Sequence, residues 1–230
     1  MYRKTSIIVG VLFIIGTVSG VLSGILTGSL QSTPEALAAL QAHEMQWILG
    51  TLLILVMGFA LAMIPVLLYP VFKQHNEVLA LGAVLFRGVL EAVCYLAMVI
   101  TMLLLLSASR SPDAAALLQS AGEWLNQILA LVFSIGALMI HILFYQTRII
   151  PRWLSGWGLG GALLYFAAPL LSMFSPQHPA LSLESWPGTL MAPLALQEMV
   201  FAVWLIAKGF RQPQEHTTKQ FILGVTGAQS

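Results

Sequence analysis

Two carboxylates and one guanidinium lie inside long apolar runs of this sequence, where charged groups are expensive. Arg87 and Glu91 are four residues apart and therefore share one face of a helix, and Glu198 lies in the last apolar run. A charge at the centre of a bilayer costs about 2.5–3.5 kcal/mol, so three charges without partners would cost about 8–10 kcal/mol. That cost is comparable to the stability of a typical domain. We therefore expect these three side chains to contact each other, water or a ligand.

The positions of the charged residues along their helices predict a common depth. Glu91 lies about 12 residues after the start of its apolar run, and Glu198 about 12 residues before the end of its own. At 1.5 Å per residue, both carboxylates are about 18 Å from the same membrane face, near the midplane. The predicted buried polar cluster contains Arg87, Glu91, Glu198, Gln197, His141 and Tyr95.

The cluster contains two acids and one base. One arginine cannot compensate two ionised carboxylates at low dielectric, so we expect the cluster to hold a proton at neutral pH. The alternative is a structural ion pair between two helices, with the second acid solvated in a crevice.

The composition places the chain in a membrane. It has 230 residues, of which 58% are hydrophobic and 8% are charged, whereas soluble domains carry about 25% charged residues. An apolar run of about 20 residues spans the bilayer. We predict an all-α polytopic membrane protein, a bundle of six transmembrane helices in residues 1–210, followed by a polar cytoplasmic tail at 211–230. The apolar runs are 6–30, 47–72, 79–107, 124–146, 153–174 and 188–209.

The basic residues are distributed unevenly among the connections. Most of them lie before the first apolar run or after the second, fourth and sixth runs. These residues are Arg3, Lys4, Lys73, Arg148, Arg152, Lys208, Arg211 and Lys219. The other connections hold only Arg110. Lys and Arg favour the cytoplasmic side, so both termini are expected to be cytoplasmic.

Two connections on the opposite side carry a helix-start pattern. Thr33-Pro34-Glu35 and Ser111-Pro112-Asp113 each combine a hydroxyl N-cap, a proline at the first helical position and an acid in the first turn. We therefore expect the second and fourth helices to begin outside the membrane.

Small residues form a stripe along the first helix. Gly16, Gly20, Gly24 and Gly28 follow at four-residue steps, a spacing that allows another helix to approach closely. The stripe predicts either a packing face within the monomer or a homo-oligomer through the first helix.

Several classes of function lack support. A net charge of +1 argues against a nucleic-acid partner. No catalytic, nucleotide-binding or metal-ligand motif is present, so the sequence does not favour an enzyme, and we expect no cofactor and no metal. Two readings of the cluster follow: a non-catalytic interaction or sensor protein, or a small-solute or proton-linked permease. An intramembrane enzyme is a third alternative, and the ligand stays unknown.

Stretches distributed along nearly the whole chain form a recognisable set. They are GVLFIIGT at 10–17, YPVFK at 69–73, LALG at 79–82, FR at 86–87, EA at 91–92, PRWL at 151–154, WG at 157–158, PLALQEM at 193–199, WLI at 204–206 and KGF at 208–210. In order and spacing this set resembles the bacterial membrane family known as domain of unknown function 4386. The resemblance implies a multi-pass protein of the bacterial cytoplasmic (inner) membrane and includes Arg87, Glu91 and Glu198, but it brings no catalytic residues.

Overall fold

The computed structural model describes residues 2–31, 36–175, 181 and 185–211, and this part of the chain is helical without strands. Six helical segments in it are long and apolar enough to cross a membrane, which confirms the predicted all-α polytopic fold. They are α1 (Tyr2–Gln31), α3 (Glu44–Phe72), the continuous run of α4 (Glu77–Ala83), η1 (Val84–Leu90) and α5 (Glu91–Ala108), α6 (Pro112–Thr147), α7 (Arg152–Met173), and α8 (Trp186–Thr189) with α9 (Ala192–Ala207).

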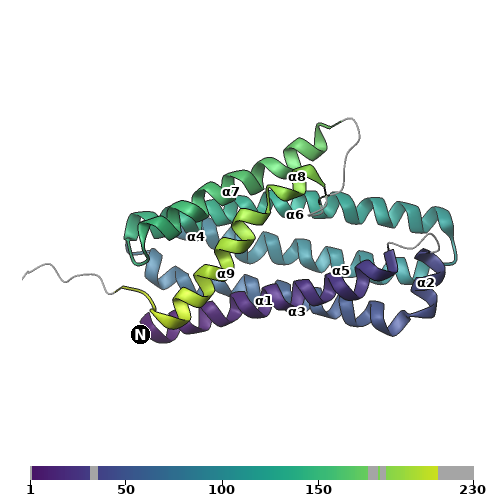
Figure 1. Ribbon diagram of the computed structural model, residues 1–230, viewed down its shortest axis with the longest axis horizontal. Helices are drawn as coiled ribbons and strands as arrows, with labels where there is room; N and C mark the ends of the chain where they lie inside the picture. The colour runs from purple at the N-terminus through teal and green to yellow at the C-terminus, as the bar shows by residue number, and fades with distance from the viewer. Residues whose placement is uncertain (1, 32–35, 176–180, 182–184, 212–230) are drawn as a thin grey trace, which may run out of the picture.

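The membrane-crossing helices form a closed ring. Going round it, α1 packs against α3, α3 against α5, α5 against α6, α6 against α7, α7 against α9, and α9 against α1. Figure 1 shows α9 crossing the bundle obliquely, from the end that holds the N-terminus toward α8. We call this end the N-terminal end, and the opposite end, which carries α2 (Ala36–Ala42), the α2 end.

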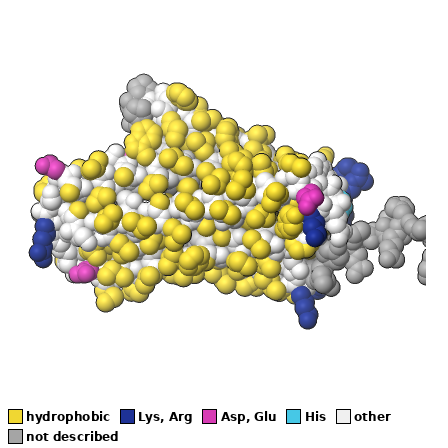
Figure 2. All heavy atoms as spheres, turned by 180° about the vertical axis from the view of Figure 1, so that it is seen from behind, with side chains coloured by type: hydrophobic (Ala, Val, Ile, Leu, Met, Phe, Trp, Pro, Cys, Tyr) yellow, Lys and Arg dark blue, Asp and Glu magenta, His cyan; other side chains and the backbone are white. Residues whose placement is uncertain are grey.

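The surface is typical of a protein embedded in lipid. A broad apolar belt covers the face in Figure 2, and the charged side chains visible there gather at the two ends. The described basic residues at the N-terminal end are Arg3, Lys4, Lys73, Arg148, Arg152, Lys208 and Arg211, and Arg110 is at the α2 end. Lys219 and the rest of the predicted tail, residues 212–230, lie outside the described residues.

The two predicted helix starts have different outcomes. Helix α6 begins at the predicted position, with Ser111 at the N-cap, Pro112 in the first turn and Asp113 after it, but the Ser111 hydroxyl makes no capping hydrogen bond. The helix extends well beyond the apolar run at 124–146. Thr33-Pro34-Glu35 lies outside the described residues. The short helix α2 that follows is separate from α3, because His43 leaves the helical conformation with φ −122° and ψ 40°.

The glycine stripe of α1 packs against α3 over only half of its length. A Cβ atom added at Gly16 would lie 2.7 Å from Leu61, and one at Gly20 would lie 2.7 Å from Met57, so both glycines allow α3 to approach. At Gly24 and Gly28 an added Cβ would meet no atom within 4 Å. The half of the stripe nearer the N-terminal end is thus used for packing between α1 and α3.

Aromatic side chains fill the ring toward the N-terminal end. The rings of Phe72 and Phe144 have centroids 5.0 Å apart, Phe144 and Phe201 also 5.0 Å, and Phe13 and Phe201 5.6 Å, all in edge-on arrangements. These four side chains are at most 3% exposed. Such packing fills the interior of this half of the bundle.

Candidate functional site: a buried ion-pair cluster beside a cavity

A π-helical segment carries the central residue of the cluster. Within η1 the helix widens, and the N–H of Glu91 donates to the carbonyl of Phe86, five residues earlier. Segments of this kind are rare and occur frequently at functional sites. Arg87 lies in the middle of this segment and is 1% exposed.

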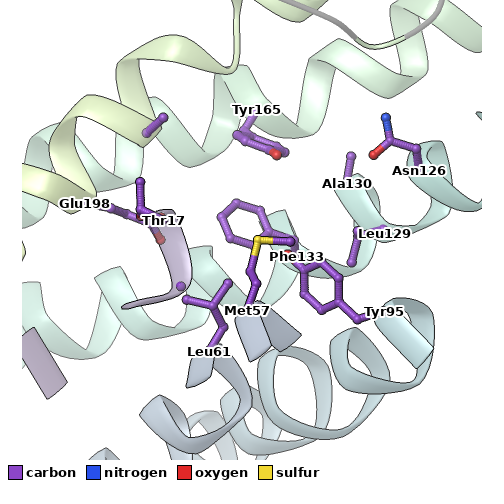
Figure 3. A pocket seen from close by; sticks show the side chains of 12 residues that line it. Thr17, Met57, Leu61, Tyr95, Asn126, Leu129, Ala130, Phe133, Tyr165 and Glu198 are labelled. Atoms are coloured by element: carbon purple, nitrogen blue, oxygen red, sulfur yellow. The ribbon is translucent and has the colours of Figure 1, made fainter. Parts of the chain in front are cut away.

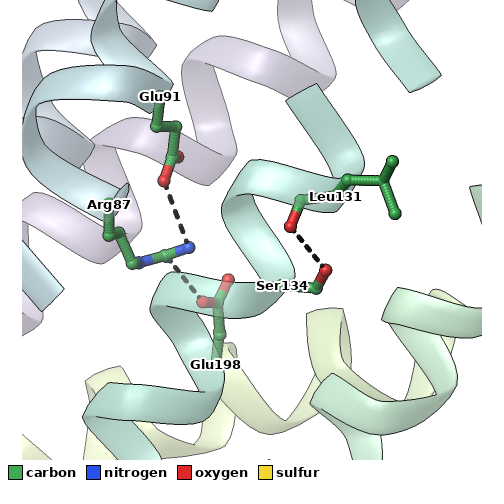
Figure 4. A network of polar contacts seen from close by, with 5 residues as sticks. All are labelled: Arg87, Glu91, Leu131, Ser134 and Glu198. Carbon is green, nitrogen blue, oxygen red and sulfur yellow. Dashed lines mark hydrogen bonds and ion pairs between the residues drawn. The ribbon is translucent and has the colours of Figure 1, made fainter. Parts of the chain in front are cut away.

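The guanidinium of Arg87 lies between the two carboxylates (Figure 4). Arg87 Nη2 donates to Glu198 Oε1 at 2.7 Å, the length of a charge-assisted hydrogen bond. Arg87 Nη1 is 3.6 Å from Glu91 Oε2, an ion pair too long for a hydrogen bond. Neither carboxylate oxygen of Glu91 has a hydrogen-bond partner among the described residues. The strong bond therefore crosses from η1 to α9, and Glu91 acts on Arg87 through charge.

Neighbouring helices fix the position of Arg87. Its guanidinium carbon lies 4.2 Å from the centroid of the Phe133 ring and 5.8 Å from that of Phe13, within the range of cation–π attraction. Gly136, one turn after Phe133, has no side chain where a Cβ would be 2.8 Å from Arg87 Cβ. Helix α6 can therefore approach the backbone of η1 closely.

A cavity of about 160 Å³, which we call the inner cavity, adjoins the cluster. Its polar lining consists of Glu198, Thr17, Tyr95, Asn126 and Tyr165, and its apolar lining includes Met57, Leu61 and Phe133. In Figure 3 Glu198 and Asn126 lie on opposite sides of it, with Tyr165 and Phe133 between them. Glu198 is 13% exposed, whereas Arg87 is not part of the lining. Of the cluster's charged groups, the cavity thus presents a carboxylate.

A second and larger cavity, of about 550 Å³, lies toward the α2 end, and we call it the outer cavity. Its lining comes from α1, α3, α5 and α6, and includes the exposed residues Gln119 and Glu123. Asn126 lines both cavities. The two cavities therefore adjoin at Asn126, with the smaller one beside Glu198 and the larger one toward the α2 end.

Of the other three predicted members of the cluster, only Tyr95 lies at the cavity, whereas Gln197 and His141 contact α7 instead. Tyr95 lines the inner cavity. Gln197 is fully buried, and its amide donates to the carbonyl of Leu154 on α7 at 3.1 Å. His141 is 3% exposed and packs against Gly158 of α7, where any side chain would overlap the imidazole ring. Neither Gln197 nor His141 lines the cavity.

Several lining residues were not predicted from the sequence. Asn126, Ala130 and Phe133 are spaced along one face of α6, and Tyr165 is on α7. The polar Asn126 inside an apolar run was the available signal, because such residues usually face the interior of a bundle.

The comparisons with known proteins add a family. A family model described as "Domain of unknown function (DUF4386)" matches residues 8–209, most of the chain. Neither the curated proteins nor the solved structures give a match.

Proposed function

We propose that this chain, which belongs to the family described as Domain of unknown function (DUF4386), is a permease that couples the transport of a small solute to a proton. Its six membrane-crossing helices make it a multi-pass membrane protein. In this proposal the solute occupies the inner cavity beside Glu198, and a carboxyl of the cluster takes the coupling proton. The observation that carries it is Glu198 itself, which is bound to Arg87 at 2.7 Å and also lines a cavity.

The distribution of space in the bundle supports this reading. Both cavities lie on the α2 side of the cluster, while Phe13, Phe72, Phe144 and Phe201 pack the other half. Alternating access requires a site that opens toward one side of the membrane in one of its states, and cavities on the α2 side of the cluster fit such a state. A purely structural ion pair would need no cavity beside it.

The reading as an interaction or sensor protein has less support in the geometry. It relied on the glycine stripe of α1, in which Gly16 and Gly20 are occupied by contacts with α3, so that only Gly24 and Gly28 stay open to a partner helix. A homo-oligomer through the first helix stays a prediction, which the oligomeric state in a mild detergent would test.

The orientation belongs to the same proposal. We place the protein in the bacterial inner membrane with the N-terminal end, where basic residues gather, in the cytoplasm. The α2 end and the larger cavity then face outward. Cysteine accessibility tests this orientation in a Cys94→Ala variant, which has no native cysteine. A cysteine introduced at Glu44, at the exposed α2 end, should react with a membrane-impermeant maleimide in intact cells, and one at Lys73 should react only after lysis.

Thermal unfolding in the presence of solutes tests the function. The purified protein in detergent would be screened against small amines, alcohols, amino acids and carboxylates at millimolar concentration. A solute that binds the folded state at 100 times its Kd stabilises it by about 2.7 kcal/mol.

The control is a variant that fills the cavity. Ala130 is 3% exposed and lines the inner cavity, so Ala130→Leu places new atoms there without touching a charge. We expect at least one solute to stabilise the wild type and not Ala130→Leu. If no solute in the panel distinguishes the two proteins, the proposal is wrong.

A further inference from the structure

We propose that the inner cavity binds a small organic cation, a protonated or quaternary amine, with Glu198 as its counter-ion. The inference rests on the proposed function, because it names the class of solute that the permease would carry. Arg87 faces the cluster and not the cavity, so the guanidinium is not available to an anionic solute.

Charge balance favours a cation. The cluster holds two carboxylates, Glu91 and Glu198, and one guanidinium, and all three groups lie within the ring. With both acids ionised the cluster has a formal charge of −1, which is costly at low dielectric. One positive charge in the cavity makes this ionised site neutral, and it can take the place of the proton that the cluster is expected to hold without a solute. A solute with a negative charge would double the imbalance.

The lining matches the requirements of an amine. Cations are attracted to the faces of aromatic rings within about 6 Å, and a carboxylate beside aromatic rings is a common arrangement for amine recognition. The cavity has Tyr95, Phe133 and Tyr165 around it. The Phe133 ring already contacts the Arg87 guanidinium, 4.2 Å from its centroid, and its centroid is 4.6 Å from that of Tyr165, so Tyr95 and Tyr165 are the rings left for a bound amine. The hydroxyl of Thr17 and the amide of Asn126 add polar atoms for a substituent of the amine.

The volume limits the size of the solute. A cavity of roughly 150 Å³ holds a molecule such as benzene, and the inner cavity measures about 160 Å³. A solute of about five to seven non-hydrogen atoms therefore fits, which includes tetramethylammonium and choline. Larger amines would have to extend past Asn126 into the outer cavity.

Three probes of nearly equal shape isolate the charge. They are choline, neutral 3,3-dimethylbutan-1-ol and anionic 3,3-dimethylbutanoate, with tetramethylammonium as a smaller cation. Calorimetric titration of the purified full-length protein would give the Kd of each. We expect the two cations to bind at least tenfold more tightly than the neutral and anionic probes.

Two variants locate the binding site, each with a matched control. Glu198→Gln removes the charge at constant size, and Ala130→Leu fills the cavity while leaving the ion pair in place; both should weaken choline binding at least tenfold. The controls are Glu44→Gln, at the exposed start of α3, and Ala192→Leu, at the exposed start of α9, and both should bind like the wild type. If Glu198→Gln does not fold, Ala130→Leu still decides the location.

The outcomes separate this inference from the proposed function. If the neutral or anionic probe binds more tightly than choline and Ala130→Leu abolishes that binding, the cation class is wrong while a solute site remains. If neither cation binds, or if both bind equally well to Ala130→Leu, the inference is wrong. The proposed function then depends on the broader solute panel described above.

Discussion

Gly136→Ala is the substitution that most directly tests how the fold positions Arg87. The added Cβ would lie 2.8 Å from Arg87 Cβ, 2.9 Å from its N and 3.2 Å from its Cα. Ordinary contacts begin at about 3.4 Å, so α6 and η1 must separate by roughly 0.6 Å. Two of the three atoms belong to the backbone, which cannot rotate away as a flexible side chain can.

The expected cost follows from this geometry. Overpacking a well-packed interface costs about 1–3 kcal/mol, from which the better helix propensity of alanine subtracts about 0.5–1 kcal/mol. We expect Gly136→Ala to lower the free energy of unfolding by about 1–2 kcal/mol. Because the guanidinium moves with η1, its 2.7 Å bond to Glu198 should lengthen, and solute binding should weaken with it.

The assay is reversible unfolding in mixed detergent, followed by circular dichroism. Gly160 provides the control, since a Cβ there meets nothing within 4 Å, and Gly160→Ala on α7 should be neutral or slightly stabilising. If Gly136→Ala is as stable as Gly160→Ala and binds solute equally well, then close approach of α6 does not hold Arg87 in place.

Two further substitutions probe the interior. Arg87→Leu should lower the free energy of unfolding by about 3–5 kcal/mol, because it leaves two buried carboxylates without a partner. The double variant Arg87→Leu with Glu198→Leu should recover part of that loss, and equal stability of the single and double variants would contradict the pairing. Trp47→Phe should cost about 1–2 kcal/mol, since the buried indole donates to the carbonyl of Met102 at 2.8 Å and phenylalanine cannot. Chemical unfolding measures both, and an unchanged midpoint for Trp47→Phe would show that this hydrogen bond adds no stability.

The sequence alone was sufficient to predict the helical membrane fold and the need of Arg87, Glu91 and Glu198 for partners. Apolar length alone predicts the membrane-crossing helices, and the cost of burying charge explains why Arg87, Glu91 and Glu198 had to find partners. The depth of a residue along its helix, however, does not predict the direction in which its side chain points around the helix axis. Neighbouring helical residues point about 100° apart, so Gln197 faces α7 while Glu198 faces the cavity.

Two local features could not be predicted from periodicity. The π-helical segment adds a residue to one turn and shifts the faces on either side of it, and no residue type in Val84–Leu90 marks that change. The break at His43 is likewise not marked by residue type, since His43 is neither proline nor glycine. Both are consequences of tertiary packing, which overrides local preference.

The ion pair between η1 and α9 has a consequence for biosynthesis. Ribosomes add about 5–20 residues per second, so Glu198 emerges roughly 5–20 s after Arg87. During that interval the ring is still open, and the guanidinium must enter the membrane without its closest partner. Glu91 is on the same segment and 3.6 Å away, so the arginine is inserted with a counter-charge already beside it. Glu91, whose carboxylate makes no hydrogen bond among the described residues, thus serves as a counter-charge for Arg87 from the moment the helix forms.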